Sequence, residues 1–252
     1  MVKFAKPDKD KKINNMNENL KEEGSIHNSV ENGILIITFS HPKSNALPGS
    51  LLVRLAEEIV SAGDNLDVKV IVLQSAGEKA FCAGASFDEL LAIDTFERGK
   101  EFFMGFARVI NAARKCPKFI IGRVQGKAVG GGIGLASAVD YCMASDAGSI
   151  RLSELALGIG PFVVGPVVQR KIGISAFSQL SVNPTQWQSA GWAKEKGLYS
   201  DVFSTLSELD KAVNTLALSL AHSSPEDRKE LKTVVWEGTE HWEELLAQRA
   251  EI

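Results

Sequence analysis

The chain has 252 residues, of which 28 are basic and 31 acidic, and its net charge is −3. Because the two signs are mixed along the chain, no basic face for a nucleic acid is indicated. The 44% of hydrophobic residues suffices for one large α/β core, but no apolar run approaches the roughly 20 residues of a membrane span. Cys82, Cys116 and Cys142 are too widely spaced for a metal cluster and favour a reducing compartment. We expect a soluble cytoplasmic protein with no metal site and no membrane or nucleic-acid partner.

Residues 1–26 differ in composition from the rest of the chain. They are rich in Lys, Asn, Asp and Glu, contain few apolar residues and show neither a helical nor a strand period. Such a segment cannot bury enough apolar surface to offset the entropy that is lost on ordering. We therefore predict a flexible N-terminal arm over residues 1–26.

From residue 34 onwards, strand patterns and helix patterns alternate. Short apolar runs rich in β-branched residues predict strands, and apolar residues three and four apart predict amphipathic helices. Strands are predicted over 34–39, 68–74, 119–124 and 141–144, and helices over 51–62, 101–113 and 131–139. This alternation is typical of a mainly parallel sheet that is covered by helices.

After about residue 164 the strand patterns fade, whereas helical patterns continue. Helices are predicted over 167–172, 187–196, 206–222 and 225–250. We accordingly divide the ordered chain into a core over 27–200 and a helical C-terminal oligomerisation region over 201–252. Trp236, Trp242 and Leu245 lie in the second region, and we expect these apolar side chains to need the surface of a partner subunit.

Two glycine-containing turns stand out, and each follows a strand-like segment of the sequence. They are Ala83, Gly84 and Ala85, and the triplet Gly130, Gly131 and Gly132. One such turn is more often a packing device than a binding site, since glycine also serves tight contacts and positive φ angles. The triplet, however, enters a predicted helix, where bare N–H groups and the helix dipole favour negative charge. Together, the two turns could hold an enolate oxygen through one N–H group each.

The segments 81–85 and 126–132 resemble the two oxyanion-hole segments of the enoyl-CoA hydratase/isomerase (crotonase) family. By this resemblance, the N–H groups of Ala85 and Gly131 polarise the carbonyl of an acyl-CoA thioester. The segment 41–47 resembles the first CoA-contacting turn of the family, and 189–198 resembles its later helix-turn signature. The resemblance implies a crotonase-like spiral of ββα turns and a homotrimer or hexamer, with CoA as part of the substrate and no separate cofactor.

The resemblance also identifies one catalytic carboxylate. The segment 152–158 is similar to the one that carries the second family glutamate, so Glu154 is the candidate general acid/base. Gly134 stands where the best-known hydratases have their first glutamate. The remaining candidate residues, which the resemblance places around the substrate, are Lys43, Asn45, Ala46, Leu47, Ala83, Ser86, Phe87, Gly130, Gly132, Pro161 and Phe162. Asp140, in contrast, is expected to have a structural role.

Hydration of an α,β-unsaturated acyl-CoA to a 3-hydroxyacyl-CoA is the leading functional prediction. Gly134 and the apolar stretch around Phe162 are similar to the methylglutaconyl-CoA hydratases of leucine breakdown. Isomerisation of a 3-enoyl-CoA to a 2-enoyl-CoA is a rival, because it requires only one carboxylate, and decarboxylation of an acyl-CoA is a third alternative. A non-enzymatic CoA-ester-binding or RNA-binding protein on the same scaffold is the fourth. No motif of a serine hydrolase or a P-loop nucleotide hydrolase occurs in the sequence.

Overall fold

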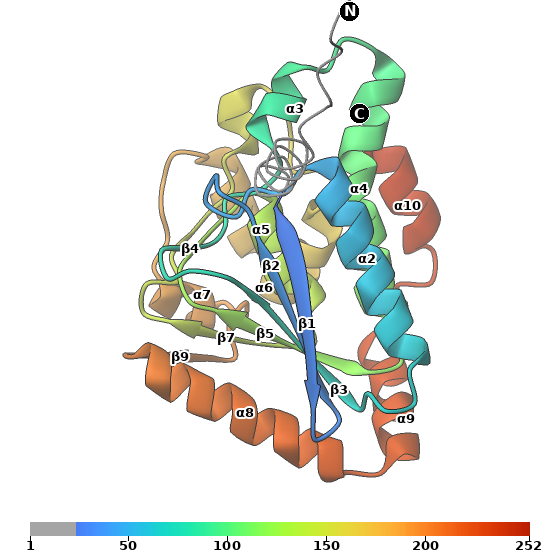
Figure 1. The fold of residues 1–252 in the computed structure, drawn as a ribbon. Helices are drawn as coiled ribbons and strands as arrows, with labels where there is room; N and C mark the ends of the chain where they lie inside the picture. Colours follow the sequence, from blue (N-terminus) through green and yellow to red (C-terminus); the bar gives the residue numbers. More distant parts are fainter. Residues whose placement is uncertain (1–23) are drawn as a thin grey trace, which may run out of the picture.

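The computed structural model describes residues 24–252, which form two β-sheets and the helices around them (Figure 1). The larger sheet has six strands in the order β1-β2-β3-β5-β7-β9, and only the β1–β2 pair is antiparallel. Its strands are β1 (Ser25–Glu31), β2 (Ile34–Ser40), β3 (Val70–Ser75), β5 (Phe119–Val124), β7 (Tyr141–Ser145) and β9 (Asp201–Phe203). The mainly parallel sheet predicted from the sequence is confirmed.

A smaller parallel sheet contains β4 (Ala80–Cys82), β6 (Lys127–Val129) and β8 (Ile150–Arg151). Each of its strands directly follows a strand of the larger sheet, so that β3 leads to β4, β5 to β6 and β7 to β8. A helix then follows each pair. The chain therefore winds as a spiral of ββα turns, which confirms the predicted fold class. None of the three short strands was predicted, because two or three residues are too few to show a period.

The hairpin of β1 and β2 was also missed. Its turn consists of Asn32 and Gly33, with φ angles of 53° and 78°. Asn-Gly between two strands favours this kind of turn, since both residues tolerate positive φ. The predicted arm over 1–26 therefore extends too far, because β1 begins at Ser25. The rest of that arm, residues 1–23, lies outside the described residues.

The two faces of the larger sheet are covered by different helices. Ile71 and Leu73 of β3 belong to the main core together with α2 (Gly49–Asp64) and α4 (Phe96–Lys115). Val70 and Val72, which point the other way, pack against α8 (Leu206–His222). Figure 1 shows α8 lying across the sheet on the side opposite to α2 and α4.

The remaining helices are α3 (Phe87–Leu91), α5 (Gly131–Ala138), the 3₁₀ turn η1 (Glu154–Leu157), α6 (Gly165–Val182), α7 (Ala190–Glu195), α9 (Pro225–Val235) and α10 (Trp242–Arg249). The single helix predicted over 225–250 is wrong. The chain leaves the helix after Val235, and Gly238 adopts a left-handed φ of 82°. In addition, β9 lies at the start of a region that was predicted to be wholly helical. Within residues 24–252, no helix is both long and apolar enough to cross a bilayer.

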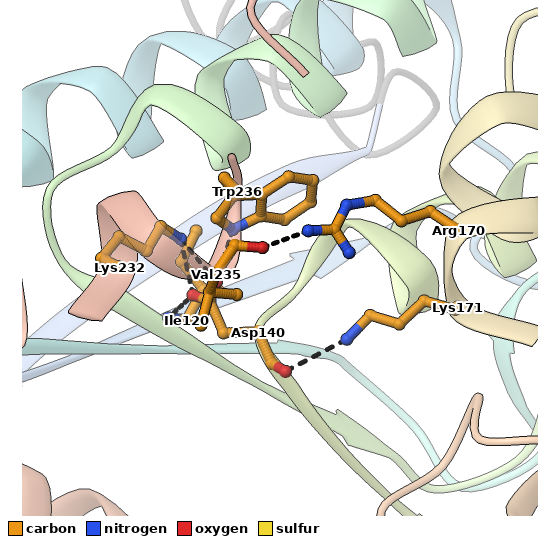
Figure 2. Close-up of polar contacts among 7 residues, drawn as sticks. All are labelled: Ile120, Asp140, Arg170, Lys171, Lys232, Val235 and Trp236. Atoms are coloured by element: carbon orange, nitrogen blue, oxygen red, sulfur yellow. Dashed lines mark hydrogen bonds and ion pairs between the residues drawn. The ribbon is translucent and has the colours of Figure 1, made fainter. Parts of the chain in front are cut away.

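Asp140 joins the C-terminal helices to the core (Figure 2). Its carboxylate accepts hydrogen bonds from the backbone N–H of Ile120, from the Nζ of Lys232 and from the indole N–H of Trp236, over 2.6–2.8 Å. The side chains of Lys232 and Asp140 are only 3% and 6% exposed. Asp140 therefore lies at the centre of a buried polar network, and these contacts support the structural role expected for it.

The tryptophans of the C-terminal region are buried within their own subunit. Trp236 and Trp242 are 7% and 6% exposed, and their rings pack edge to face with centroids 6.2 Å apart. Leu245 is partly buried against the same core. The expectation that these side chains require a partner subunit is therefore wrong. The oligomeric state itself stays a prediction.

Candidate active site

A cavity of about 410 Å³ opens where β4, β6 and β8 end. Its wall is mostly apolar and includes Phe102, Phe103 and Phe106 of α4, together with residues 159–164, which follow η1. The turn after β4, the turn after β6 and Glu154 also line it. Because the strands of the small sheet are parallel, their carboxyl ends meet at one edge, and the two glycine-containing turns lie side by side there.

Backbone hydrogen bonds fix the first turn. Leu47 donates its N–H to the carbonyl of Gly84 at 2.8 Å and accepts the N–H of Ser86 at 3.0 Å. Since both bonds go to the neighbours of Ala85, the N–H of Ala85 itself points away from Leu47. The segment 41–47 thus sets the direction of the Ala85 donor without contributing to the cavity wall.

The second turn places Gly131 at the start of α5. Gly130, with a φ of 52°, reverses the chain there, and a Cβ added to Gly84 would lie 3.5 Å from the N atom of Gly131. The two turns are therefore in close contact. Within residues 24–252, neither the N–H of Ala85 nor that of Gly131 donates a hydrogen bond. Two backbone donors thus line the cavity without an acceptor, as an oxyanion hole requires.

Gly131 cannot be replaced by a larger residue without movement. A Cβ at this position would lie 2.2 Å from the nearest ring carbon of Phe106, a clash that no rotamer of the new residue avoids. The sequence pattern did not indicate Phe106, because it lies on α4, 25 positions before Gly131. Only the packing of α4 against α5 brings the ring beneath the turn.

Glu154 is the first residue of η1, and its side chain turns towards Gly130. The Oε2 atom is inaccessible to solvent and has no hydrogen-bond partner among the described residues. Burial raises the pKa of Glu154 to about 7, against a smaller opposing effect of the backbone N–H groups of residues 154 and 153. A carboxyl group with this pKa can both remove and return a proton near neutral pH.

Among residues 24–252, no second carboxylate lines the cavity with Glu154. Gly134, on α5, is covered by Val164, since a Cβ at Gly134 would lie 2.6 Å from Cγ1 of Val164. Val164 also lines the cavity. The best-known hydratases resemble one another in having a glutamate at the position of Gly134. In this protein, the apolar side chain of Val164 fills the corresponding space.

The structure brings together part of the predicted site. The predicted residues that line the cavity are Ala83, Ala85, Phe87, Gly130, Gly131, Glu154, Pro161 and Phe162. Those outside its wall are Lys43, Asn45, Ala46, Leu47, Ser86 and Gly132.

Most of the residues outside the wall have a structural partner. The side chain of Asn45 bonds the backbone of His41, Ala76 and Ala80 and so joins the segment 41–47 to the chain just before β4. Lys43 forms an exposed ion pair with Asp88, and Ser86 accepts the N–H of Glu89 at the start of α3. A Cβ at Gly132 would lie 2.4 Å from the carbonyl oxygen of Cys82, so this glycine allows α5 to approach β4.

The comparison with protein families agrees with this geometry. The model of the enoyl-CoA hydratase/isomerase family matches residues 29–251, and the chain belongs to that family. The description of the family and the names of its members are those of enzymes that act on acyl-CoA thioesters, and the protein is classed with them.

Individual relatives differ in the reaction that their names describe. Over 216 residues, the chain is 29% identical to the peroxisomal Δ(3,5)-Δ(2,4)-dienoyl-CoA isomerase of Arabidopsis thaliana, covering 79% of this chain and 76% of the relative. Over 205 residues, it is 31% identical to the carnitinyl-CoA dehydratase of Escherichia coli (strain K12), covering 80% and 76%.

Solved structures share the fold. A crotonase-type enoyl-CoA hydratase/isomerase from Legionella pneumophila has a TM-score of 0.79 at 27% identity, covering 86% of this chain and 84% of that one. An enoyl-CoA hydratase from Bacillus halodurans has a TM-score of 0.83 at 22% identity, covering 90% and 92%. The second likeness shows the fold alone.

Proposed function

We propose that the protein moves the double bond of a 3-enoyl-CoA to the 2 position, with Glu154 as the only acid/base group. The observation that carries this proposal is the contact between Val164 and Gly134, because among residues 24–252 no carboxylate other than that of Glu154 lines the cavity. A shift of the double bond needs one group that removes a proton and returns it, and no water. The apolar wall of the cavity suits such a reaction.

The chemistry follows from the positions of three groups. The carboxylate of Glu154 removes a proton from C2, and the electron pair of that C–H bond forms the C1–C2 double bond of a dienolate. The negative charge moves to the thioester oxygen, where the N–H groups of Ala85 and Gly131 stabilise it. Glu154, now protonated, returns the proton to C4, and a double bond between C2 and C3 results.

Hydration of a 2-enoyl-CoA is the second candidate. The similarity to a carnitinyl-CoA dehydratase supports it, because the name describes removal of water, the reverse of hydration. Glu154 would take a proton from water as the water attacks C3 and would deliver a proton to C2. Methylglutaconyl-CoA remains the particular substrate that the sequence resemblance implies for this reaction. Decarboxylation and CoA-ester binding without turnover would also use the two backbone donors.

A panel of substrates distinguishes these reactions. The purified protein is incubated separately with 3-hexenoyl-CoA, 2-hexenoyl-CoA and 3-methylglutaconyl-CoA, and the products are identified by chromatography and mass. Isomerisation keeps the mass of the ester, hydration adds one water, and decarboxylation removes CO₂. Conversion of 3-hexenoyl-CoA that is much faster than hydration of either 2-enoyl ester supports the proposal, whereas hydration alone would overturn it.

Two variants make the test specific. Glu154→Gln removes the proposed acid/base group, and Glu57→Gln removes an exposed carboxylate of α2 that lies outside the cavity. The proposal requires turnover to fall in the first variant and to stay at the wild-type level in the second. A comparable loss in both would point to a general effect of charge.

A further inference from the structure

Lys127 and Arg151 both lie over the ring of Trp187, beside the cavity. The Nζ of Lys127 is 5.1 Å and the Cζ of Arg151 is 4.7 Å from the ring centroid. Both distances fall in the range of cation–π contacts, which helps to hold the two side chains in place. Two positive charges are therefore gathered at one exposed aromatic ring.

The backbone explains this arrangement. Arg151 on β8 lies opposite Val129 on β6, and Lys127 lies two residues before Val129, so that all three side chains point to the same face of the small sheet. Gln188 pairs with Ile150 through two backbone hydrogen bonds of 2.9 Å, which brings Trp187 next to this face. The cluster is thus built on strand pairing.

The positive charges of this cluster are not balanced. Within residues 24–252, neither Lys127 nor Arg151 forms an ion pair with a carboxylate. The Nε of Arg151 is inaccessible to solvent and has no hydrogen-bond partner among the described residues. A buried donor without an acceptor is costly, and the two like charges beside the ring repel each other. An anion at this position would relieve both costs.

The cluster adjoins the catalytic groups. The carbonyl of Arg151 accepts the N–H of Gly130 at 3.0 Å, and Arg151 and Glu154 are lining residues of the same cavity.

We infer that Lys127, Arg151 and Trp187 form a binding site for an anionic group of the thioester substrate, either a phosphate of its CoA part or a carboxylate on its acyl part. The inference rests on the proposed function only in taking an acyl-CoA as the ligand. A guanidinium group held over an aromatic ring can donate two hydrogen bonds to the oxygens of either group.

Binding of saturated esters tests this site without catalysis, because these ligands have no double bond to move or hydrate. Isothermal titration calorimetry is used with butyryl-CoA, butyryl-pantetheine, glutaryl-CoA and valeryl-CoA, on the wild type and on Arg151→Gln. Arg98→Gln is the matched control, since Arg98 is an exposed arginine of α4 that pairs with Asp94. We expect Arg151→Gln to weaken binding of those esters that carry the recognised anion about tenfold or more. Arg98→Gln should have no such effect.

The pattern of losses identifies the anion. A loss for butyryl-CoA that is absent for butyryl-pantetheine assigns the site to a CoA phosphate. A loss for glutaryl-CoA that is absent for valeryl-CoA assigns it to an acyl carboxylate. Equal losses for all four ligands, or none, would overturn the inference. Circular dichroism checks that the variant is folded, and Lys127→Gln provides a second test on an exposed side chain. Because the saturated esters are not turned over, these affinities test the anion site even if the protein does not catalyse the proposed isomerisation.

Discussion

The carboxylate of Glu154 lies against the backbone of Gly130, since a Cβ added to Gly130 would be 3.1 Å from Oε1 of Glu154. Gly130 directly precedes Gly131, so the proposed acid/base group and the proposed oxyanion donor are held by the same turn. Both can therefore act on the first carbons of one thioester.

Replacing Glu154 by Gln should reduce turnover by roughly 10² or more, because the amide cannot exchange a proton at a useful rate. Binding of butyryl-CoA should change by only a small factor, since size and part of the hydrogen bonding are kept. Steady-state kinetics and calorimetry measure the two quantities. If the variant keeps more than about a tenth of the wild-type rate, Glu154 is not the acid/base group.

The rate should also follow the ionisation of Glu154. Because burial raises its pKa to about 7, the carboxylate that removes the first proton is lost below this pH. We expect kcat/KM to fall about tenfold for each pH unit below 7 and to be level above it. A profile that bends only near pH 4.5, the value of an unperturbed glutamate, would contradict this assignment.

Stability should depend on pH through the same group. Between pH 4.5 and about 7, Glu154 binds a proton in the folded protein but not in the unfolded one. The free energy of unfolding is therefore higher below this range and decreases as the pH rises through it, by on the order of 3 kcal/mol at most. Glu154→Gln should be more stable than the wild type at pH 8, and this difference should disappear at pH 4. Urea denaturation at both values measures it, and an unchanged difference would contradict the prediction.

Gly131→Ala should reduce turnover by roughly 10² to 10³, because the clash with Phe106 displaces the N–H donor. Phe106→Leu removes the ring atoms that the new Cβ would meet. The double variant should therefore recover part of the activity, and the two substitutions should not be additive. A Gly131→Ala variant with full activity would show that residue 131 does not hold the thioester oxygen.

Asp140 and Lys232 should stabilise the protein without affecting catalysis. Replacing Lys232 by Met leaves a buried carboxylate without its charge partner and should cost about 3 to 5 kcal/mol in the free energy of unfolding. The double variant with Asp140→Asn should lose less than the sum of the single losses. Denaturation curves test this, with kcat at low temperature as the control. Loss of kcat in a folded Lys232→Met variant would contradict a purely structural role.

The sequence alone determined the class of fold and the two glycine turns of the candidate site. Short apolar runs predicted the strands β2, β3, β5 and β7 close to their observed bounds. Apolar residues three and four apart did the same for the helices α2 and α8. The two glycine turns were recognisable because a bare backbone near a helix start is a local property. Glu154 was found only through its resemblance to a family segment.

Tertiary structure decided what surrounds these groups. The contacts of Phe106 with Gly131, Val164 with Gly134 and Trp187 with Arg151 join residues that are 25, 30 and 36 positions apart. No local pattern encodes such contacts, because they depend on how whole helices and strands pack. The same holds for Trp236 and Trp242, whose apolar character was plain in the sequence. Only folding of the C-terminal helices onto their own core, anchored by Asp140, decided that the two rings are buried within one subunit.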